Sequence, residues 1–443
     1  MISHVIPVKL VNLIPRFGFV FVFSISIFLG PSEILAQPII IDSTGSEIIT
    51  DKKPHPNTIP YSSDRTVFEH VLALPAYVFD WVTMPLEYGL KVTERKLPQL
   101  LQGERGPYGI YPLFELGGNT DFAYGFLGFH NELWKQYHRL RLTGIFGSKD
   151  YNNFELDYTI PSFLSKKGTF EIDAFYGNDP SVSLFMGNDA DLNDKLIYST
   201  EKAEASLEYG HKFTNQIKFS TTSSYYMLNI GRSDFDEENL SGSDIITPIP
   251  DALTGTASML SIKTNINFNL ASGTPRINKG SRYGLAIDWQ QSLNNDDYHF
   301  VEYTAEWNQF IPFFFLPDSR RLAFKGALNK IESLGGKATP FFALPSLGGS
   351  SNLRGYTTNR FRDSGSLLLT LEYRYPLWSF ADIVLFIDEG HVFNHYSEIS
   401  LEEFHENYGA GLHFLSAKGF AFRGEYAFST ESSRLILSIN KNF

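Results

Sequence analysis

Apolar and polar side chains alternate along many short stretches of the chain after residue 109. In the stretch 282–290, Tyr283 and Leu285 are separated by small or polar residues, and the stretch 301–308 shows the same pattern. Successive side chains of a strand point to opposite faces, so a period of two predicts strands with one apolar face and one charged face.

This pattern predicts sixteen strands in an all-β fold. They are expected at 110–118, 122–131, 138–147, 153–161, 168–177, 202–212, 216–228, 257–270, 281–292, 298–311, 320–331, 366–377, 381–392, 407–415, 419–428 and 434–443. The long predicted loops follow odd-numbered strands, at 178–201, 229–256, 332–365 and 393–406. An even number of strands, with long loops at one end and short turns at the other, is typical of bacterial outer-membrane barrels.

The apolar faces of the strands indicate whether such a barrel is soluble or lies in a membrane. A closed barrel of this size is too wide for inward-pointing apolar side chains to fill, whereas lipid covers apolar side chains that point outward. We therefore predict a 16-stranded antiparallel transmembrane β-barrel with a polar lumen, whose outer face contacts outer-membrane lipid. A secreted β-sandwich, with its apolar faces inside, is the alternative.

The N-terminal region has a different pattern. Lys9 and Arg16 flank the short apolar run 17–30, which predicts a signal peptide over residues 1–36. The run is shorter than the roughly 20 apolar residues of a spanning helix, and an inner-membrane anchor is the alternative. Residues 37–63, rich in Pro, Ser, Thr and charge, predict a flexible periplasmic leader.

Residues 64–108 predict a short helical segment before the barrel at 109–443. Apolar residues recur there at helical spacing, and Pro75 and Pro85 interrupt the run. The segment either packs on the periplasmic rim of the barrel, anchors in the membrane interface or fills the lumen as a plug.

Composition fits the same class of protein. The 443 residues contain no cysteine and carry a net charge of −12, and 15% of them are aromatic. The absence of cysteine excludes a disulfide framework and a thiolate metal site, and the acidic balance argues against nucleic acid as a partner. The aromatic content suits the aromatic girdles of a membrane barrel.

One long segment, SLGGSSNLRGYTTNRFRD (346–363), lies between two alternating stretches. Hairpin loops are normally far shorter, and a long loop in a compact domain is usually functional or disordered. This loop carries large side chains such as Leu353 and Tyr356 beside Arg354, and these need surfaces to pack on. We expect a loop that turns back and places the guanidinium on carboxylates.

The sequence LGGSSNLRGYTTNRF resembles the signature loop of the Omp85 superfamily (BamA-like and surface-antigen barrels), in which an LRGY or VRGF tetrapeptide folds back into the barrel. The tetrapeptide here is Leu353, Arg354, Gly355 and Tyr356. LEYRYPL (371–377) and FIDEGHVF (386–393) resemble the next strand and the F-x-D-x-G strand of that family.

The resemblance implies a barrel in the bacterial outer membrane and a specific set of contacts. Arg354 is expected to pair with Glu372 and Asp388, and Gly390 completes the F-x-D-x-G motif. Family members often carry globular POTRA modules before the barrel. We expect none in this chain, because the leader is short and lacks their alternating strand and helix pattern.

The alternation leads to the same pairing. Leu371 and Ile387 belong to the apolar, lipid-facing sides of their strands, so Glu372 and Asp388 face the lumen on neighbouring strands. Two adjacent carboxylates repel each other and favour a cation between them, and Arg354 is within reach along the chain.

The last strand ends in an aromatic residue. Its apolar face is formed by Leu435, Leu437, Ile439 and Phe443. A terminal amphipathic strand of this kind resembles the recognition signal of outer-membrane barrels, because an assembly machine can pair with an exposed strand.

Other candidate sites are less specific. Asp189, Asp191 and Asn193 have the initial spacing of a calcium loop, but the turn glycine and the bidentate glutamate are missing, which favours a solvated surface loop. His391 and His413 have no second ligand at zinc spacing, and no nucleophile motif is present. We expect no metal, no cofactor and no enzymatic activity.

Three functions fit the sequence. The first is an Omp85-type barrel that helps to insert or translocate client proteins or lipids at the outer membrane. The second is a passive channel or structural surface antigen. The third is an outer-membrane enzyme that uses lumen acids with His391 or His413. The first is preferred, because the loop and strand motifs are intact.

Overall fold

The computed structural model describes residues 107–116, 122–134, 137–148, 150–192, 195–233, 247–248, 254–273, 278–294, 298–312, 320–337, 339–378, 381–400, 402–415 and 421–440. The predicted signal peptide and leader lie outside these residues, as do Phe443 and the predicted helical segment up to residue 106. Tyr108, predicted to end that segment, instead begins the first strand. None of the described residues forms a helix that is long and apolar enough to cross a membrane.

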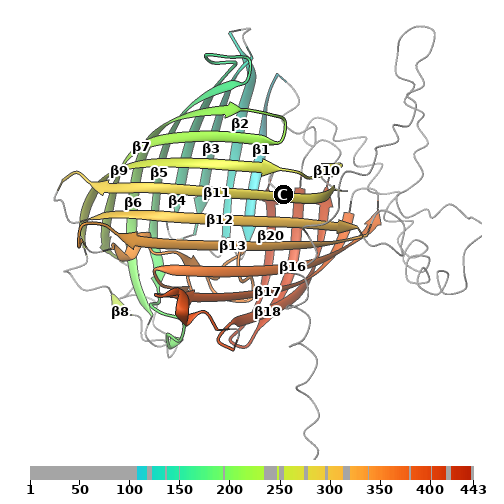
Figure 1. Cartoon of the computed structure of the whole chain (residues 1–443). Helices are drawn as coiled ribbons and strands as arrows, with labels where there is room; N and C mark the ends of the chain where they lie inside the picture. Colours follow the sequence, from blue (N-terminus) through green and yellow to red (C-terminus); the bar gives the residue numbers. More distant parts are fainter. Residues whose placement is uncertain are drawn as a thin grey trace, which may run out of the picture. The chain divides into compact units, whose positions relative to one another are not determined.

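Sixteen long strands among the described residues form one closed antiparallel barrel (Figure 1). They are β1 (Tyr108–Leu116), β2 (Phe122–Leu133), β3 (His138–Gly147), β4 (Asn152–Pro161), β5 (Gly168–Leu184), β6 (Leu196–Lys212), β7 (Ile217–Arg232), β9 (Gly255–Asn269), β11 (Asn278–Ser292), β12 (His299–Pro312), β13 (Arg321–Ser333), β16 (Gly365–Trp378), β17 (Ala381–Phe393), β18 (His405–Leu415), β19 (Ala421–Ser429) and β20 (Ser433–Asn440). Each strand pairs with its neighbour along the chain, and β20 pairs back with β1. The predicted fold class and strand number are confirmed.

Shorter elements lie in the connections between these strands. They are β8 (Thr247–Pro248), β10 (Ser272–Gly273), β14 (Ser346–Leu347) and β15 (Phe361–Arg362), together with the 3-10 turns η5 (Phe341–Ala343) and η6 (Tyr396–Glu398). The pair β14–β15 forms a small sheet of its own within the described residues, at the base of the loop 334–364.

The two faces of the strands lie as the alternation predicts. On β11, Leu285 and Ile287 are each 53% exposed, whereas Asp288 and Gln290 are 8% and 9% exposed. Apolar side chains on the open outer surface need lipid to cover them, and the polar side chains line the lumen.

β5, β6 and β7 continue well beyond their predicted ends. β5 reaches Leu184 and β6 begins at Leu196, so that the predicted loop 178–201 shortens to 185–195, and β7 continues to Arg232. Pairing between β5 and β6 resumes after a register shift between Asp179 and Val182. The predicted end of β5 was wrong because Asn, Asp and Pro at 178–180 are typical of turns, and here they lie within the strand at this shift.

An apolar cluster lies at the long-loop end of the lumen. Phe341 and Phe342 of η5 pack against the inward-facing Tyr198, Tyr226 and Leu228 and against further buried residues of β9, β12 and β13. The loop between β13 and β16 therefore folds over the barrel interior and is held there partly by apolar contacts.

Candidate functional site: the inserted loop and the seam

The loop 334–364, here called the inserted loop, folds back on itself inside the barrel. The Gly349 amide donates to the Tyr356 carbonyl at 3.2 Å, and the Tyr356 amide donates to the Leu353 carbonyl at 3.0 Å. Leu353 is fully buried with a φ of +45°, a left-handed conformation that a leucine adopts only when its surroundings hold it. The turn thus presents the next residue, Arg354, to the barrel wall.

Arg354 is buried against three carboxylates. Its Nε and Nη2 donate to Asp388 at 2.9 and 2.8 Å in a bidentate pair, and its Nη1 donates to Glu372 and to Glu425, each at 3.1 Å. The guanidinium also lies over the ring of Phe386, with its Cζ 3.5 Å from the ring centroid. This arrangement, called the latch below, joins the loop to β16, β17 and β19.

Asp388 is the best-bonded member of the latch. It accepts five hydrogen bonds, of which three come from Arg354, one from Thr370 and one from Asn407. A buried carboxylate is stable as an ion only when its oxygens are satisfied in this way.

The charges of the latch balance. Arg374 donates to Glu372 at 2.6 Å, and Arg423 lies 3.8 Å from Glu425. Three carboxylates therefore face three guanidinium groups. Burial alone would lower the pKa of Arg354, but the facing carboxylates, with Asp388 first, raise it above the ordinary arginine value. The guanidinium thus stays charged in its buried position.

Apolar packing and close backbone approach support these polar contacts. Leu347, Leu353, Tyr356 and Phe361 of the loop pack on Leu368 and Val392 of the barrel wall. A Cβ atom at Gly390 would lie 2.8 Å from a terminal methyl group of Leu347 and 3.2 Å from one of Leu353, so a larger residue there would displace these packed side chains.

The loop also binds the hairpin turn between β19 and β20. Ser429 and Ser432 donate to the Gly355 carbonyl at 2.9 and 2.8 Å, and Arg360 forms a bidentate pair with Glu431 at 2.8 Å. A Cβ atom at Gly355 would lie 2.7 Å from Asn407, so this position requires glycine for the close approach.

The structure brings most of the sequence-predicted residues together. Arg354 lies against Glu372 and Asp388, while Gly355, Tyr356 and Gly390 shape the contact surface. In β20, Leu435 and Leu437 lie on the lipid side, opposite in parity to the buried Ile436 and Ser438. Ile439 has the same parity, but its side chain lies outside the described part of the structure.

Sequence reasoning missed four contributors: Glu425, His413, Arg374 and Glu431. Glu425 is buried and accepts from Arg354, and it lies 2.7 Å from the Nε2 atom of His413. The alternation of β19 already predicts that Glu425 faces away from lipid. Strand parity predicts which face an acid lies on. It does not predict that acids from three different strands lie at the same height along the barrel axis.

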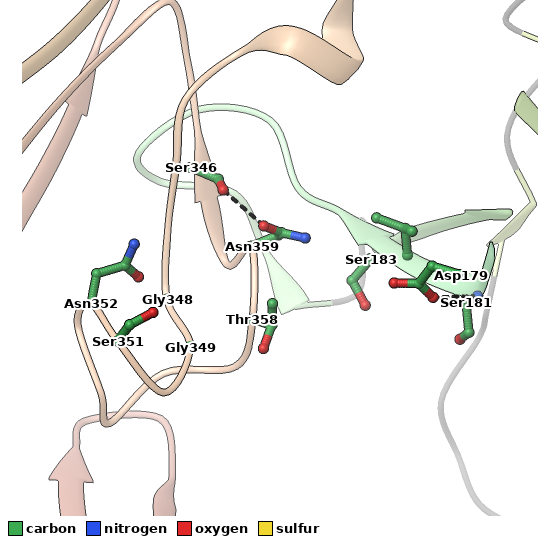
Figure 2. A pocket seen from close by; sticks show the side chains of 11 residues that line it. Asp179, Ser181, Ser183, Ser346, Gly348, Gly349, Ser351, Asn352, Thr358 and Asn359 are labelled. Carbon is green, nitrogen blue, oxygen red and sulfur yellow. Dashed lines mark hydrogen bonds between the residues drawn. The ribbon is translucent and has the colours of Figure 1, made fainter. Parts of the chain in front are cut away.

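Two polar cavities lie beside the loop. One of about 170 Å³ lies between the end of β5 and the loop; Figure 2 shows Asp179, Ser181 and Ser183 on one side. On the other side, the Ser346 hydroxyl donates to Asn359 at 2.7 Å (Figure 2). A second cavity of about 560 Å³ is lined by β4–β12 and η5 and contains charged residues such as Lys202 and Asp288.

Within the described residues, no group of three or more His, Asp or Glu side chains is arranged to hold a metal ion. The segment with the calcium-like spacing packs on other loops instead: Asn188 donates to the Glu403 carbonyl at 3.0 Å, and His405 contacts the Asn188 carbonyl at 2.8 Å. Asn193 lies outside the described residues.

The contact between the first and last strands, called the seam below, closes the barrel. Among the described residues, β1 and β20 pair at Phe114–Ile439, Glu115–Ser438 and Leu116–Leu437. Residues 117–121 and 441–443, next to these pairs, lie outside the described residues. The first and last barrel strands of the chain are therefore direct neighbours.

Comparisons with known proteins agree with this geometry. The model of the Omp85 superfamily domain matches residues 136–436. Among solved structures, BamA from Haemophilus ducreyi lacking POTRA domains 1–3 is similar, with a TM-score of 0.56 and 16% identity over 76% of this chain and 70% of that chain.

CdiB from Acinetobacter baumannii is also similar, with a TM-score of 0.51 and 12% identity over 76% of this chain and 60% of that chain. CdiB from Escherichia coli has a TM-score of 0.50 and 11% identity over 76% of this chain and 62% of that chain. At sequence identities this low, the comparisons show that these proteins share the fold of this chain. No curated protein matches the sequence.

Proposed function

The chain belongs to the Omp85 superfamily and lies in the bacterial outer membrane, and from this premise we propose that it assists the insertion or translocation of proteins or lipids there. Its partners on this proposal are client outer-membrane proteins or lipids, together with the surrounding outer-membrane lipid.

The seam is the observation that carries the proposal. Every other pair of neighbouring barrel strands is consecutive along the chain, whereas β1 and β20 are the first and last barrel strands and no loop joins them directly, so they can separate along their length. Two separated strands present free backbone N–H and C=O groups, with which a client strand can pair. The same opening connects the polar lumen to the membrane.

The latch supports this function by holding the inserted loop against the C-terminal strands of the barrel, of which β19 neighbours the seam strand β20. Arg354 contacts β16, β17 and, through Glu425, β19, while the rest of the LRGY motif packs below the β19–β20 turn. A lumen kept in one arrangement near the seam lets β1 and β20 move without unfolding the other strands.

A passive channel is the second candidate, and the polar cavity of about 560 Å³ favours it. The inserted loop and the apolar cluster under η5 narrow the same lumen. Conductance of the purified barrel in a planar bilayer separates the two functions, because a passive channel conducts steadily with the seam closed.

The test of the first candidate uses a lockable seam. Leu116 and Leu437 lie opposite each other across it, and the chain contains no cysteine, so Leu116→Cys with Leu437→Cys introduces the sole disulfide. In cells depleted of the protein, the reduced variant should restore the levels of other outer-membrane proteins and lipid asymmetry, and the oxidised variant should not.

The matched controls are the two single-cysteine variants, which should work under both conditions. Full activity of the oxidised double variant would contradict a function that needs the seam to open. Steady conductance with no effect of depletion would favour the passive channel instead.

A further inference from the structure

The larger of the two cavities beside the inserted loop, about 560 Å³ in volume, is called the roofed cavity below. Its wall consists of lumen-facing side chains of the strands from β4 to β12, and Phe342 and Ala343 of η5 form its roof. Small-molecule sites in proteins have volumes of roughly 300–1,000 Å³. A molecule of that class would therefore fit, and it would contact both the barrel wall and the inserted loop.

One part of the wall is a connected hydrogen-bond network. The Tyr226 hydroxyl donates to Gln290 at 2.7 Å, the Gln290 amide donates to Asp288 at 3.0 Å, and the Ser261 hydroxyl donates to the other oxygen of Asp288 at 2.6 Å. These four side chains are 5% to 9% exposed and hold one another in fixed positions. Each carboxylate or amide oxygen can still accept a further hydrogen bond from a ligand.

A lysine of the wall already occupies the position that an organic cation would take. The Lys202 ammonium lies 2.6 Å from Glu204 and 4.6 Å from the ring centroid of Tyr226. A carboxylate beside an aromatic face is a combination that binds organic cations, and here a side chain of the protein fills it. Lys263 also lines the cavity, so a cationic ligand would meet two positive charges.

An anionic ligand is disfavoured for the corresponding reason. Asp179, Glu204, Asp288 and Glu302 all line the cavity, so a negatively charged molecule would meet four carboxylates. A purely apolar ligand would leave these polar groups without partners, which costs free energy. The lining therefore favours a ligand that is neutral and rich in hydrogen-bonding groups.

Aromatic rings complete the lining. Phe342 lies in the roof, and Phe175 and Tyr198 belong to the wall. A saccharide matches both kinds of surface, because its hydroxyl groups donate and accept hydrogen bonds and the C–H groups of its ring faces pack on aromatic rings.

We propose that the roofed cavity binds a short neutral saccharide, with Asp288 and Gln290 bonded to its hydroxyl groups and Phe342 packed on a ring face. The cavity lies inside the closed barrel, whereas lipid contacts the outer face of the strands. The ligand is therefore a soluble saccharide and not the sugar part of a membrane lipid. This inference goes beyond the proposed function and does not depend on an opening seam.

Isothermal titration calorimetry of the full chain in detergent micelles, with maltotriose, raffinose and chitotriose as probes, tests the proposal. At least one of the three should bind saturably, and Asp288→Asn should weaken that binding about tenfold, since hydrogen bonds to a charged acceptor are stronger than those to a neutral one. The matched control is Asp173→Asn, which makes the same change at a lumen acid that does not line the cavity and should bind like wild type.

Phe342→Leu is the second variant, because it keeps an apolar roof without the ring and leaves the wall unchanged. It should weaken saccharide binding several-fold, and heat-modified gel mobility checks that each variant is folded. If none of the three saccharides binds saturably, or if both cavity variants bind like wild type, the proposal is wrong.

Two further probes test the class and the source of the ligand. Saturable binding of spermidine without binding of any saccharide would show a site for organic cations and overturn the proposal. Lipopolysaccharide added to the micelles should not compete with the bound saccharide, and competition would contradict a soluble source.

Discussion

Two walls of the lumen carry carboxylates, and they differ in how cationic side chains neutralise those carboxylates. On the wall formed by β16–β19, three acids converge on Arg354 and are balanced by guanidinium groups at 2.6–3.8 Å. On the wall formed by β4–β6, inward-facing positions carry Glu155, Asp157, Glu171, Asp173, Asp179, Glu204 and Glu208.

The acids of the second wall have separate cationic partners. Lys202 pairs with Glu204 at 2.6 Å and Lys218 with Glu208 at 3.4 Å. Asp157 lies opposite Arg141 of β3 on one side and opposite Asp173 of β5 on the other. Like charges directly opposite each other destabilise a sheet pair. The same alternation therefore places acids on both walls, but only on the wall of β16–β19 do three of them converge on one loop arginine.

The largest expected effect comes from removing the shared cation. Arg354→Ala leaves Glu372, Asp388 and Glu425 buried with excess negative charge, and breaking a buried pair from one side costs about 3–5 kcal/mol. Urea unfolding of the barrel in vesicles, and its heat-modified mobility on gels, should both show the loss.

The control for this variant is Arg139→Ala, an exposed arginine of β3, which should change the unfolding free energy by less than about 0.5 kcal/mol. Equal stability of the two variants would show that the latch contributes no more than a surface charge.

Asp388→Asn should have the next largest effect. The substitution removes a charge that accepts five hydrogen bonds and places an amide donor opposite the guanidinium, so we expect a loss of about 2–3 kcal/mol. Limited proteolysis of the inserted loop gives a second measurement, since the loop should be cut faster. Wild-type protection would rule out a docking role for Asp388.

Glu425→Gln should cost less, about 1–2 kcal/mol. The amide oxygen still accepts from Arg354 and His413, and the lost charge was only partly matched by Arg423 at 3.8 Å. Urea unfolding of the barrel in vesicles measures this loss of unfolding free energy. A loss as large as that of Asp388→Asn would mean that the ranking of the latch acids by their hydrogen bonds is wrong.

The acidic wall should respond in the opposite direction. Asp173→Asn removes one of two opposed charges and should stabilise the barrel by about 0.5 kcal/mol at low salt, with less effect at high salt. A destabilisation similar to that of the latch variants would show that this wall, too, depends on its charges.

The sequence was sufficient for the strand number because lipid enforces a strict period of two over each spanning stretch. It was insufficient at Leu184 and Leu196, where β5 and β6 continue past a register shift and are held by the apolar cluster as well as by backbone pairing. Arg354, Glu372 and Asp388 were predictable from a motif and from parity. The third acid, Glu425, and the hydrogen bond from the Ser350 hydroxyl to Glu115 were not, because they join residues 71 and 235 positions apart.

The length of β5 has a consequence for the bilayer around the protein. At about 3.3 Å per residue and a tilt near 45°, its 17 residues reach about 40 Å, whereas the hydrocarbon is about 25–30 Å thick. The paired ends of β5 and β6 therefore project beyond the acyl chains, and lipid headgroups surround them. A thicker membrane can cover this part of the barrel without leaving apolar side chains in water.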